Sequence, residues 1–248
     1  MGMEKVIEVK NLTKKYSKLV AVDNISFKVE KGEVFALLGE NGAGKTTTLE
    51  IIEGLRKPTS GEIKVLDLDI KKNLNKVKEK IGVQLQASAY FDDLKLKEIL
   101  ELFGSFYKMH LYPTRLFKMV GLESKANQYI RNLSGGQKQR FSIIASLIND
   151  PEIIFLDEPT TGLDPIARRN TWKIISQIEE SGKTIILTTH YMEEAEILCD
   201  RVAIMDKGKI IALDTPHNLI VKSPNSKNLE DVFIELTGKT ISDESNGE

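Results

Sequence analysis

The stretch VFALLGENGAGKT, residues 34–46, decides the fold of this 248-residue chain. It begins with a short apolar run that is typical of a buried strand. Residues 39–46 then fit the phosphate-binding pattern G-x-x-x-x-G-K-S/T without a mismatch. A helix is expected over residues 45–55, with the positive end of its dipole directed at a bound anion. The order of strand, loop and helix predicts a nucleotide-phosphate site, whereas a plain glycine-rich turn is the alternative interpretation.

Two carboxylates and two loop residues supply the chemistry that such a site needs. Lys45 can reach the β- and γ-phosphates, and the Thr46 hydroxyl can bind Mg²⁺. The apolar run before Asp157 predicts a buried strand, so Asp157 lies where open parallel sheets bind ligands and can hold Mg²⁺. Glu158 follows and can point to the γ-phosphate; the alternative is an acidic helix cap. The other expected nucleotide contacts are Gly39, Asn41, Gly42, Gly44 and Thr47.

Residues 133–137 read LSGGQ, and Ser134 is expected to cap a helix that runs through Leu147. This helix offers a second N-terminus to phosphate. The phosphate loop followed by LSGGQ resembles the ATP-binding cassette (ABC) ATPases, in which LSGGQ is the signature sequence. The resemblance implies that two copies close around ATP and Mg²⁺, with each signature contacting the nucleotide of the other copy. The implied contacts are Ser134, Gly135, Gly136 and Gln137.

The resemblance extends to four further positions. It implies that Glu158 is the general base that polarises the attacking water, and that Asp164 belongs to a loop across the dimer seam. His190 follows an apolar run and resembles the switch histidine that holds the water and Glu158; a structural histidine is the alternative. Tyr16 is implied to stack on the adenine, although it could instead pack the small β-lobe.

The segment IGVQLQ, residues 81–86, ends in two glutamines on the same face of an expected strand. The family pattern favours Gln86 over Gln84 as the catalytic glutamine that contacts Mg²⁺ or water and links the site to the transport partner. We predict that Tyr90 and Phe91 line the groove in which this partner docks, because aromatic residues serve as interface anchors. The alternative is that one of them fills the core of the neighbouring helices.

These motifs predict an α/β fold. It consists of a P-loop NTPase core with a mainly parallel sheet, an amino-terminal antiparallel β-lobe, and a helical insertion that carries the signature. We expect a single ABC ATPase domain over residues 1–240, with the insertion at about 88–140. Residues 241–248 are polar and acidic, and this composition predicts a disordered tail.

Composition narrows the set of partners. The formal net charge of −1 provides no basic field, so no nucleic-acid partner is expected. The single cysteine, Cys199, precludes an intrachain disulfide. No apolar run approaches the roughly 20 residues that span a bilayer. A transport role therefore implies a separate transmembrane permease subunit, with this chain peripheral on the cytoplasmic face of the membrane.

Residues 190–196 and 228–238 resemble the corresponding segments of drug-resistance-type bacterial ABC exporters. Two positions depart from the family pattern: Asp67, where glycine is frequent, and residues 87–90, where a Glu-Pro pair is common. The sequence thus predicts an ATP-hydrolysing subunit that powers an exporter, expected to pair with a second copy of itself. Three alternatives stay open: an importer, a heterodimer, and a soluble ATP-dependent clamp. The sequence does not identify the transported substrate.

Overall fold

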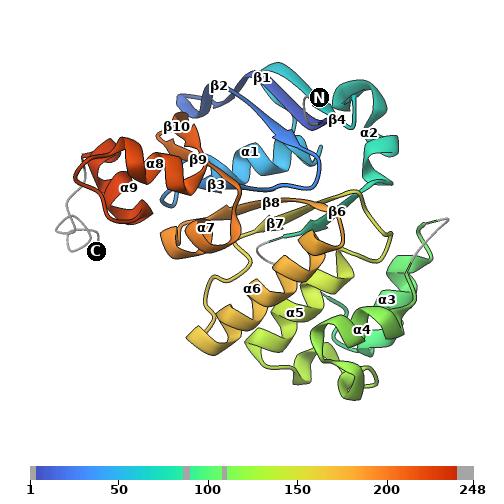
Figure 1. Cartoon of the computed structure of the whole chain (residues 1–248). Helices are drawn as coiled ribbons and strands as arrows, with labels where there is room; N and C mark the ends of the chain where they lie inside the picture. The colour runs from blue at the N-terminus through green and yellow to red at the C-terminus, as the bar shows by residue number, and fades with distance from the viewer. Residues whose placement is uncertain (1–3, 86–89, 108–110, 239–248) are drawn as a thin grey trace.

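The structure is a computed structural model that describes residues 4–85, 90–107 and 111–238 (Figure 1). Its amino-terminal part is an antiparallel sheet with the strand order β2-β1-β4-β5. The strand bounds are β1 Lys5–Tyr16, β2 Leu19–Glu30, β4 Ser60–Val65 and β5 Leu68–Asp69. Burial alternates over the second half of β2, because successive side chains of a strand point to opposite faces, whereas register shifts interrupt the alternation in β1. The predicted β-lobe is confirmed.

The second sheet has the order β10-β9-β3-β8-β7-β6, and its strands run parallel from β9 to β6. Its bounds are β3 Val34–Leu38, β6 Ile81–Gln84, β7 Ile153–Asp157, β8 Thr184–Thr189, β9 Arg201–Asp206 and β10 Lys209–Asp214. Only β10 pairs antiparallel, with β9, among the strands described in this sheet. Every residue of β3, β7 and β8 is buried, as expected for strands covered on both faces. The mainly parallel core is confirmed.

Strand register brings the predicted site residues to one edge. Leu38 pairs with Thr189, and Asp157 pairs with Thr188 at the ends of adjacent strands. The phosphate loop begins directly after Leu38. Because parallel strands end at the same edge, residues more than a hundred positions apart in sequence meet there.

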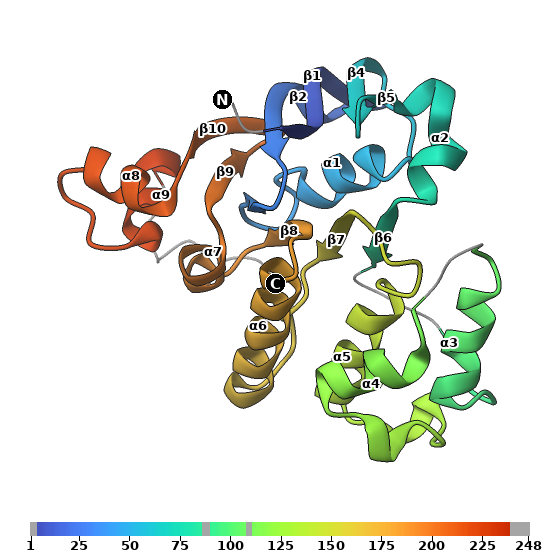
Figure 2. The ribbon, with the colours of Figure 1, turned by 45° about the vertical axis from the view of Figure 1, so that its right-hand side comes forward.

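Helices cover both faces of this sheet. Figure 1 shows α1, Lys45–Ile52, between the two sheets, while α6, Pro165–Glu180, lies on the opposite side of the parallel strands. In Figure 2 the helical insertion projects away from the antiparallel sheet, and its helix α5 lies beside α6. The other bounds are α2 Ile70–Lys78, α3 Leu96–Gly104, α4 Pro113–Val120, η1 Glu123–Lys125, η2 Ile130–Asn132, α5 Gly135–Ala145, α7 Met192–Leu198, α8 Pro216–Lys222 and α9 Leu229–Thr237. None of the described helices is long and apolar enough to cross a membrane.

Local structure differs from the pattern-based expectations at α1 and α2, and it accommodates the departure at Asp67. The first helix ends at Ile52 rather than at residue 55, and Gly54 follows with a left-handed φ of 76°. Helix α2 was not predicted; Asp69 caps it by accepting the Lys71 N–H. Asp67 replaces the frequent glycine and takes a φ of 59°, a region that aspartate tolerates better than most residues. The predicted tail lies outside the described residues.

Glu53 is an unusual residue at the carboxyl end of α1. It is 1% exposed, and neither carboxylate oxygen has a hydrogen-bond partner among the described residues. Burial raises the pKa of Glu53 from 4.5 to about 8, and the charges of Asp157 and Glu50 add to this effect. The folded protein therefore holds a proton that the unfolded chain loses. The resulting stability is complete below pH 4.5 and is lost as the pH rises to about 8.

Replacing Glu53 by glutamine should remove this pH dependence. The stability of Glu53→Gln relative to wild type should rise between pH 4.5 and 8, by at most about 3–5 kcal/mol. Urea unfolding at a series of pH values measures the difference. Glu79→Gln, at an exposed position nearby, serves as the matched control. A difference between Glu53→Gln and wild type that stays constant across this range would contradict the prediction.

Candidate functional site

The backbone of the phosphate loop lies close against strand β2 at Gly44. Gly44 has a φ of 101°, and a Cβ atom there would lie 2.4 Å from the carbonyl oxygen of Ala21. Glycine is therefore required at this position by conformation and by space. Gly44 is also the N-cap of α1, and it has no side chain to cap the helix. The first N–H groups of α1 are thus available to an anion at the loop.

Lys45 is pre-positioned at the centre of the loop. Its Nζ donates to the carbonyl oxygens of Gly39 at 2.8 Å and Glu40 at 3.0 Å, and the side chain is buried. Burial lowers the pKa of Lys45, while the nearby charge of Glu158 opposes that shift. An anionic phosphate at this position would further favour the charged ammonium group.

A pocket of about 730 Å³ opens in front of the loop. Sequence analysis predicted most of its walls: Tyr16, Asn41, Gly42, Gly44, Lys45, Thr46, Thr47 and Glu158. It did not predict Leu19, Val20, Ala21 and Lys207. Lys207 lies in the turn between β9 and β10, and backbone bonds from Asp23 to Gly208 and from Gly208 to Ala43 join that turn to the β-lobe and the loop. The turn-forming run Asp206-Lys207-Gly208 was the available signal for it.

Thr46 and Asp157 meet at the floor of this site. Thr46 Oγ1 donates to Asp157 Oδ1 at 3.1 Å, and Thr188 donates to the same oxygen. Burial raises the pKa of Asp157, and the two hydroxyl donors oppose that shift. One carboxylate and one hydroxyl, of which the Thr46 hydroxyl belongs to a pocket-lining residue, suit Mg²⁺, which keeps several waters and binds substrate phosphates.

The backbone of Glu158 is strained, and this conformation directs the side chain toward the phosphate loop. Its φ is 48°, which costs a non-glycine residue roughly 1–3 kcal/mol. Thr188 anchors it by accepting the Glu158 N–H at both its hydroxyl and carbonyl oxygens, at 3.0 and 3.2 Å. The carboxylate then lies 3.6 Å from Lys45 Nζ and accepts from Thr161 at 3.0 Å. Glu158 therefore faces the loop and does not cap a helix.

His190 faces the same carboxylate. Its Nδ1 lies 3.4 Å from Glu158 Oε2, although this nitrogen makes no hydrogen bond among the described residues. The imidazole ring packs on Tyr191, with 4.2 Å between the ring centroids. The structure thus brings Lys45, Glu158 and His190 together, with the buried His190 Nδ1 facing the Glu158 carboxylate.

Tyr16 ends β1 at the rim of the pocket and is only partly buried. Lys14 Nζ lies 4.8 Å from its ring centroid, and the Arg56 guanidinium lies 5.5 Å from it. The ring is therefore a wall of the nucleotide pocket and not part of the β-lobe core. Its position allows it to stack on a base.

Tyr16→Ala should weaken ATP binding by roughly tenfold, the lower part of the range for loss of base stacking. Inhibition by inorganic triphosphate should change little, because that ligand has no base. Displacement of a fluorescent ATP analogue measures both ligands, and Tyr16→Phe is the matched control that keeps the ring. Equal weakening of both ligands would show that Tyr16 instead supports the loop by packing.

The signature residues do not line the pocket of their own chain. Ser134 caps α5 by accepting the Gln137 N–H, and the side-chain oxygen of Gln137 accepts the Ser134 N–H in return. Gly136 lies against α6, since a Cβ there would come within 3.0 Å of Ala167 Cβ. Asp164 caps α6 by accepting from two N–H groups at 2.9 Å. The signature and the Asp164 loop therefore form one continuous surface.

The two candidate glutamines differ in what the structure describes. Gln84 ends β6, is buried, and donates from Nε2 to the Leu85 carbonyl at 2.7 Å. Its Oε1 has no hydrogen-bond partner among the described residues. Gln86 lies outside the described residues, so its assignment stays a prediction.

One buried carboxylate that supports the site was missed. Glu194 on α7 is fully buried and accepts from Thr160 at 2.8 Å and from Trp172 Nε1 at 2.9 Å. It thereby ties the segment after Glu158 to helices α6 and α7. Burial raises the pKa of Glu194. No sequence pattern pointed to it, because its partners lie 22 and 34 positions away.

Comparison with known proteins agrees with this geometry. The family model described as ABC transporter matches residues 22–161. The chain is 40% identical over 242 residues to the probable multidrug ABC transporter ATP-binding protein YbhF of Escherichia coli K12, and the match covers 94% of this chain but only 42% of that protein. It is also 40% identical to the Nod factor export ATP-binding protein I of Ralstonia nicotianae, with 89% of this chain and 70% of that protein covered.

Solved structures show the same fold. An ATP-binding subunit of an ABC transporter superposes with a TM-score of 0.83 at 28% identity, covering 94% of this chain and 99% of that one. The ATP-binding cassette MJ0796, solved as a dimer in a post-hydrolysis state with ADP and Pi, gives a TM-score of 0.77 at 30% identity, with 84% and 98% covered. With the phosphate loop, the acidic pair and the signature all present, the chain belongs to the ABC transporter family and carries its ATPase cassette.

Proposed function

We propose that this chain is the ATP-hydrolysing subunit of an exporter. In the proposed assembly two copies close around ATP, and this closure is coupled to a separate membrane-spanning subunit. The observation that carries the proposal is the geometry of Glu158. Its carboxylate lies between Lys45 and His190 in front of an open phosphate loop. A carboxylate in that position can take a proton from water that attacks a γ-phosphate.

Each residue has a distinct role in this reaction. Lys45 neutralises developing charge on the phosphate oxygens, as the N–H groups at the start of α1 also do. Glu158 accepts the proton of the attacking water, and His190 holds the Glu158 carboxylate in place from its Nδ1 side. Thr46 and Asp157 would hold Mg²⁺, which would neutralise part of the negative charge of the phosphates. Gln86 is the proposed further contact to Mg²⁺ or water.

Dimerisation follows from the position of the signature. Ser134 and Gly135 are exposed and lie outside the nucleotide pocket of their own chain. They therefore present the N-terminus of α5 at the surface of the monomer, where it contributes nothing to the nucleotide pocket of the same chain. A second copy, related by a two-fold axis, can place this surface over the phosphate loop and build two identical composite sites. The dimeric state of the MJ0796 cassette supports this proposal.

Coupling to transport requires a surface for the membrane subunit, which we place beside residues 86–91. Residues 86–89 lie outside the described residues. Tyr90 lines a groove but also packs into the insertion, since its ring lies 5.3 Å from that of Phe141 and its hydroxyl donates to Ser142 at 3.0 Å. Phe91 is 58% exposed and does not line that groove. The export functions in the names of the relatives support an exporter, with the cassette peripheral at the cytoplasmic face of the membrane.

The proposed function can be tested with the purified chain. Phosphate release should require both ATP and Mg²⁺, and light scattering should detect dimers only with ATP present. Purification in detergent from the native cell should also retain a membrane-spanning subunit. If the purified chain hydrolyses ATP but no membrane-spanning subunit is retained with it from the native cell, the soluble clamp would be favoured. Binding of ATP without any hydrolysis would remove the ATPase role.

A substitution of Phe106 can test docking without disturbing folding, because this side chain lines the groove and is 71% exposed. Phe106→Ala should leave the melting temperature within a few degrees of wild type and weaken assembly with the membrane subunit by about 2 kcal/mol. Tyr90→Ala is the contrasting variant, and it should lower the free energy of unfolding by about 2 kcal/mol because it leaves a cavity beside Phe141. Thermal unfolding and pull-down in detergent measure both. Unchanged assembly of Phe106→Ala would remove this groove from the interface.

A further inference from the structure

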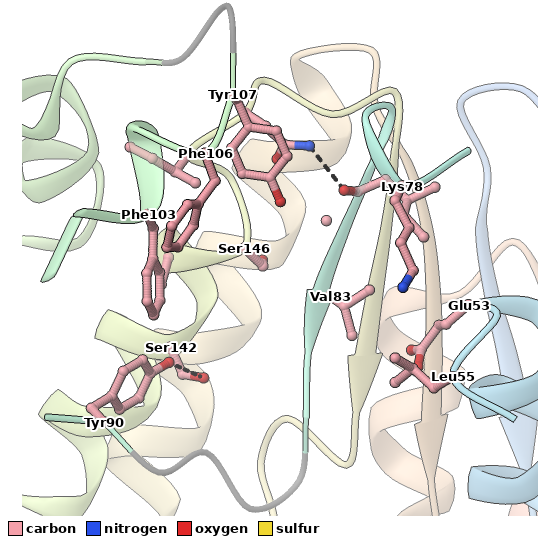
Figure 3. A pocket seen from close by; sticks show the side chains of 15 residues that line it. Glu53, Leu55, Lys78, Val83, Tyr90, Phe103, Phe106, Tyr107, Ser142 and Ser146 are labelled. Atoms are coloured by element: carbon pink, nitrogen blue, oxygen red, sulfur yellow. Dashed lines mark hydrogen bonds between the residues drawn. The ribbon is translucent and has the colours of Figure 1, made fainter. Parts of the chain in front are cut away.

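The groove beside Tyr90 has chemistry that docking of an apolar surface does not explain. It encloses about 350 Å³ between the end of α1, the end of α2, β6, α3 and α5 (Figure 3). One wall is aromatic, with Tyr90, Phe103 and Phe106 in view, and Leu55 on the opposite wall is 52% exposed. Exposed aromatic and aliphatic side chains of this kind suit a helix that lays its apolar face into a groove.

Glu53 lies in the wall opposite the aromatic residues. Figure 3 shows Glu53 together with Leu55 and Val83 in the lining of this groove. The side chain is 1% exposed, and both oxygens lack a hydrogen-bond partner among the described residues. A buried carboxyl without partners is costly, so its presence at the edge of a docking groove calls for a function.

The charged groups around Glu53 do not satisfy it. Glu50 and Asp157 are acidic and disfavour its ionised form. Lys78 lines the mouth of the same cavity, and in Figure 3 its amino group extends toward the side on which Glu53 lies. The described residues nevertheless contain no ion pair between them. An exposed lysine gains little by reaching in, because it would lose hydration and side-chain freedom.

We propose that Glu53 receives the cationic group of a basic side chain, arginine above all, on the segment of the membrane subunit that docks in this groove. The inference rests on the proposed function and adds the chemistry of the partner. An arginine has an apolar stem that can lie along Leu55 and Val83. Its guanidinium can satisfy both oxygens of a carboxylate at once and can contact an aromatic face. A docked helix would also exclude water and strengthen that pair.

This arrangement makes Glu53 a determinant of partner specificity. A docking segment with a neutral residue at this point would leave the carboxyl buried and unpaired, whereas one with an acidic residue would be repelled. Buried groups left without partners reject wrong ligands strongly. The apolar walls would give affinity, and Glu53 would select the partner that carries the cation.

A pair of synthetic peptides tests the inference on the wild-type chain. Each is a stapled helix of about 12 residues with leucines along one face, which is long enough to reach across the groove. One carries a central arginine and the other carries citrulline, its neutral isostere. Fluorescence anisotropy measures binding at a pH above 8, where the Glu53 carboxyl is ionised. The arginine peptide should bind at least tenfold more tightly.

Two variants assign the preference to Glu53. In Glu53→Gln the arginine and citrulline peptides should bind equally. In Glu79→Gln, which removes an exposed acid near the same groove, the preference should persist. A second measurement uses the wild-type chain alone. The NMR resonance of the Glu53 carboxyl carbon should shift when the arginine peptide is added and should stay unchanged when the citrulline peptide is added.

Several outcomes would overturn the inference: equal binding of the two peptides by wild type, binding of neither, or an arginine preference that survives in Glu53→Gln. A preference lost equally in Glu79→Gln would show general electrostatic attraction and would also overturn it. ATP hydrolysis by the same wild-type preparation separates the two proposals. If hydrolysis is normal and the peptides fail, only the role of Glu53 falls; if hydrolysis is absent, the proposed function falls.

Discussion

Glu158→Gln should lower the rate of ATP hydrolysis by about 10²–10⁴-fold, the contribution typical of a positioned general base. The amide keeps the size and shape of the side chain but cannot accept the proton of the attacking water. Binding of ATP should persist, since Lys45 and the loop are unchanged and a negative charge near the γ-phosphate is removed. The variant should therefore accumulate as an ATP-bound dimer, which light scattering with phosphate-release kinetics detects.

The matched control for this substitution is Glu152→Gln. Glu152 is about half exposed and pairs with Lys80 at 2.7 Å on the surface, so its loss should change the rate little. The strained backbone should be the same in wild type and in Glu158→Gln, because the surrounding backbone sets the φ of 48° at this position. A difference in rate between the two therefore reports on the carboxylate itself. Near-wild-type turnover of Glu158→Gln would rule out the role of Glu158 as the base.

Ser134→Arg should abolish cooperative hydrolysis while each monomer still binds ATP. The nucleotide pocket of the same chain is not lined by Ser134, so its affinity should be unchanged. In the proposed dimer, however, the long arginine side chain would occupy the space that the partner's γ-phosphate needs. Equilibrium titration with a fluorescent ATP analogue and light scattering measure binding and closure separately.

Loss of the helix cap must be separated from this steric effect. Ser134 accepts the Gln137 N–H at the start of α5, and removal of such a cap costs about 1 kcal/mol. Ser134→Ala loses the cap without adding bulk, so it should still dimerise and should retain much of its turnover. Wild-type turnover by Ser134→Arg, at concentrations where it stays monomeric, would exclude the composite site.

The predicted strand, loop and helix start of the phosphate site agree with the structure. Residues 34–46 form strand β3, the loop and the start of α1 in the expected order, because each step uses local preferences for apolar runs, glycine turns and helix starts. The meeting of Thr46 with Asp157 was also predictable, since parallel strands end at one edge of a sheet. Sequence analysis did not predict helix α2, for two reasons. Asn73 interrupts the helical geometry with a φ of −125°, and most positions of the helix are polar or charged, so that its few buried positions form no clear apolar pattern.

Features that depend on distant segments were not predictable. Tyr90 was expected to line a groove or fill a core, and its ring lines the groove while packing on Phe103 and Phe141, which come from two other helices. Lys207 reaches the nucleotide pocket only because the β9–β10 turn docks on the phosphate loop. Neither contact has a periodicity or a motif in the sequence.

Local sequence specifies the chemistry of this protein, because a phosphate loop, an acidic strand end and a helix-capping signature each work through neighbouring residues. Packing between remote segments specifies which surfaces that chemistry faces. It turned the signature away from the pocket of its own chain, toward a surface that a second copy can cover. It also buried Glu53 beside β6, nearly thirty residues later in the chain, and thereby placed a helix-end glutamate without a partner in a groove. Burial arises from contacts between distant elements, and no local pattern encodes it.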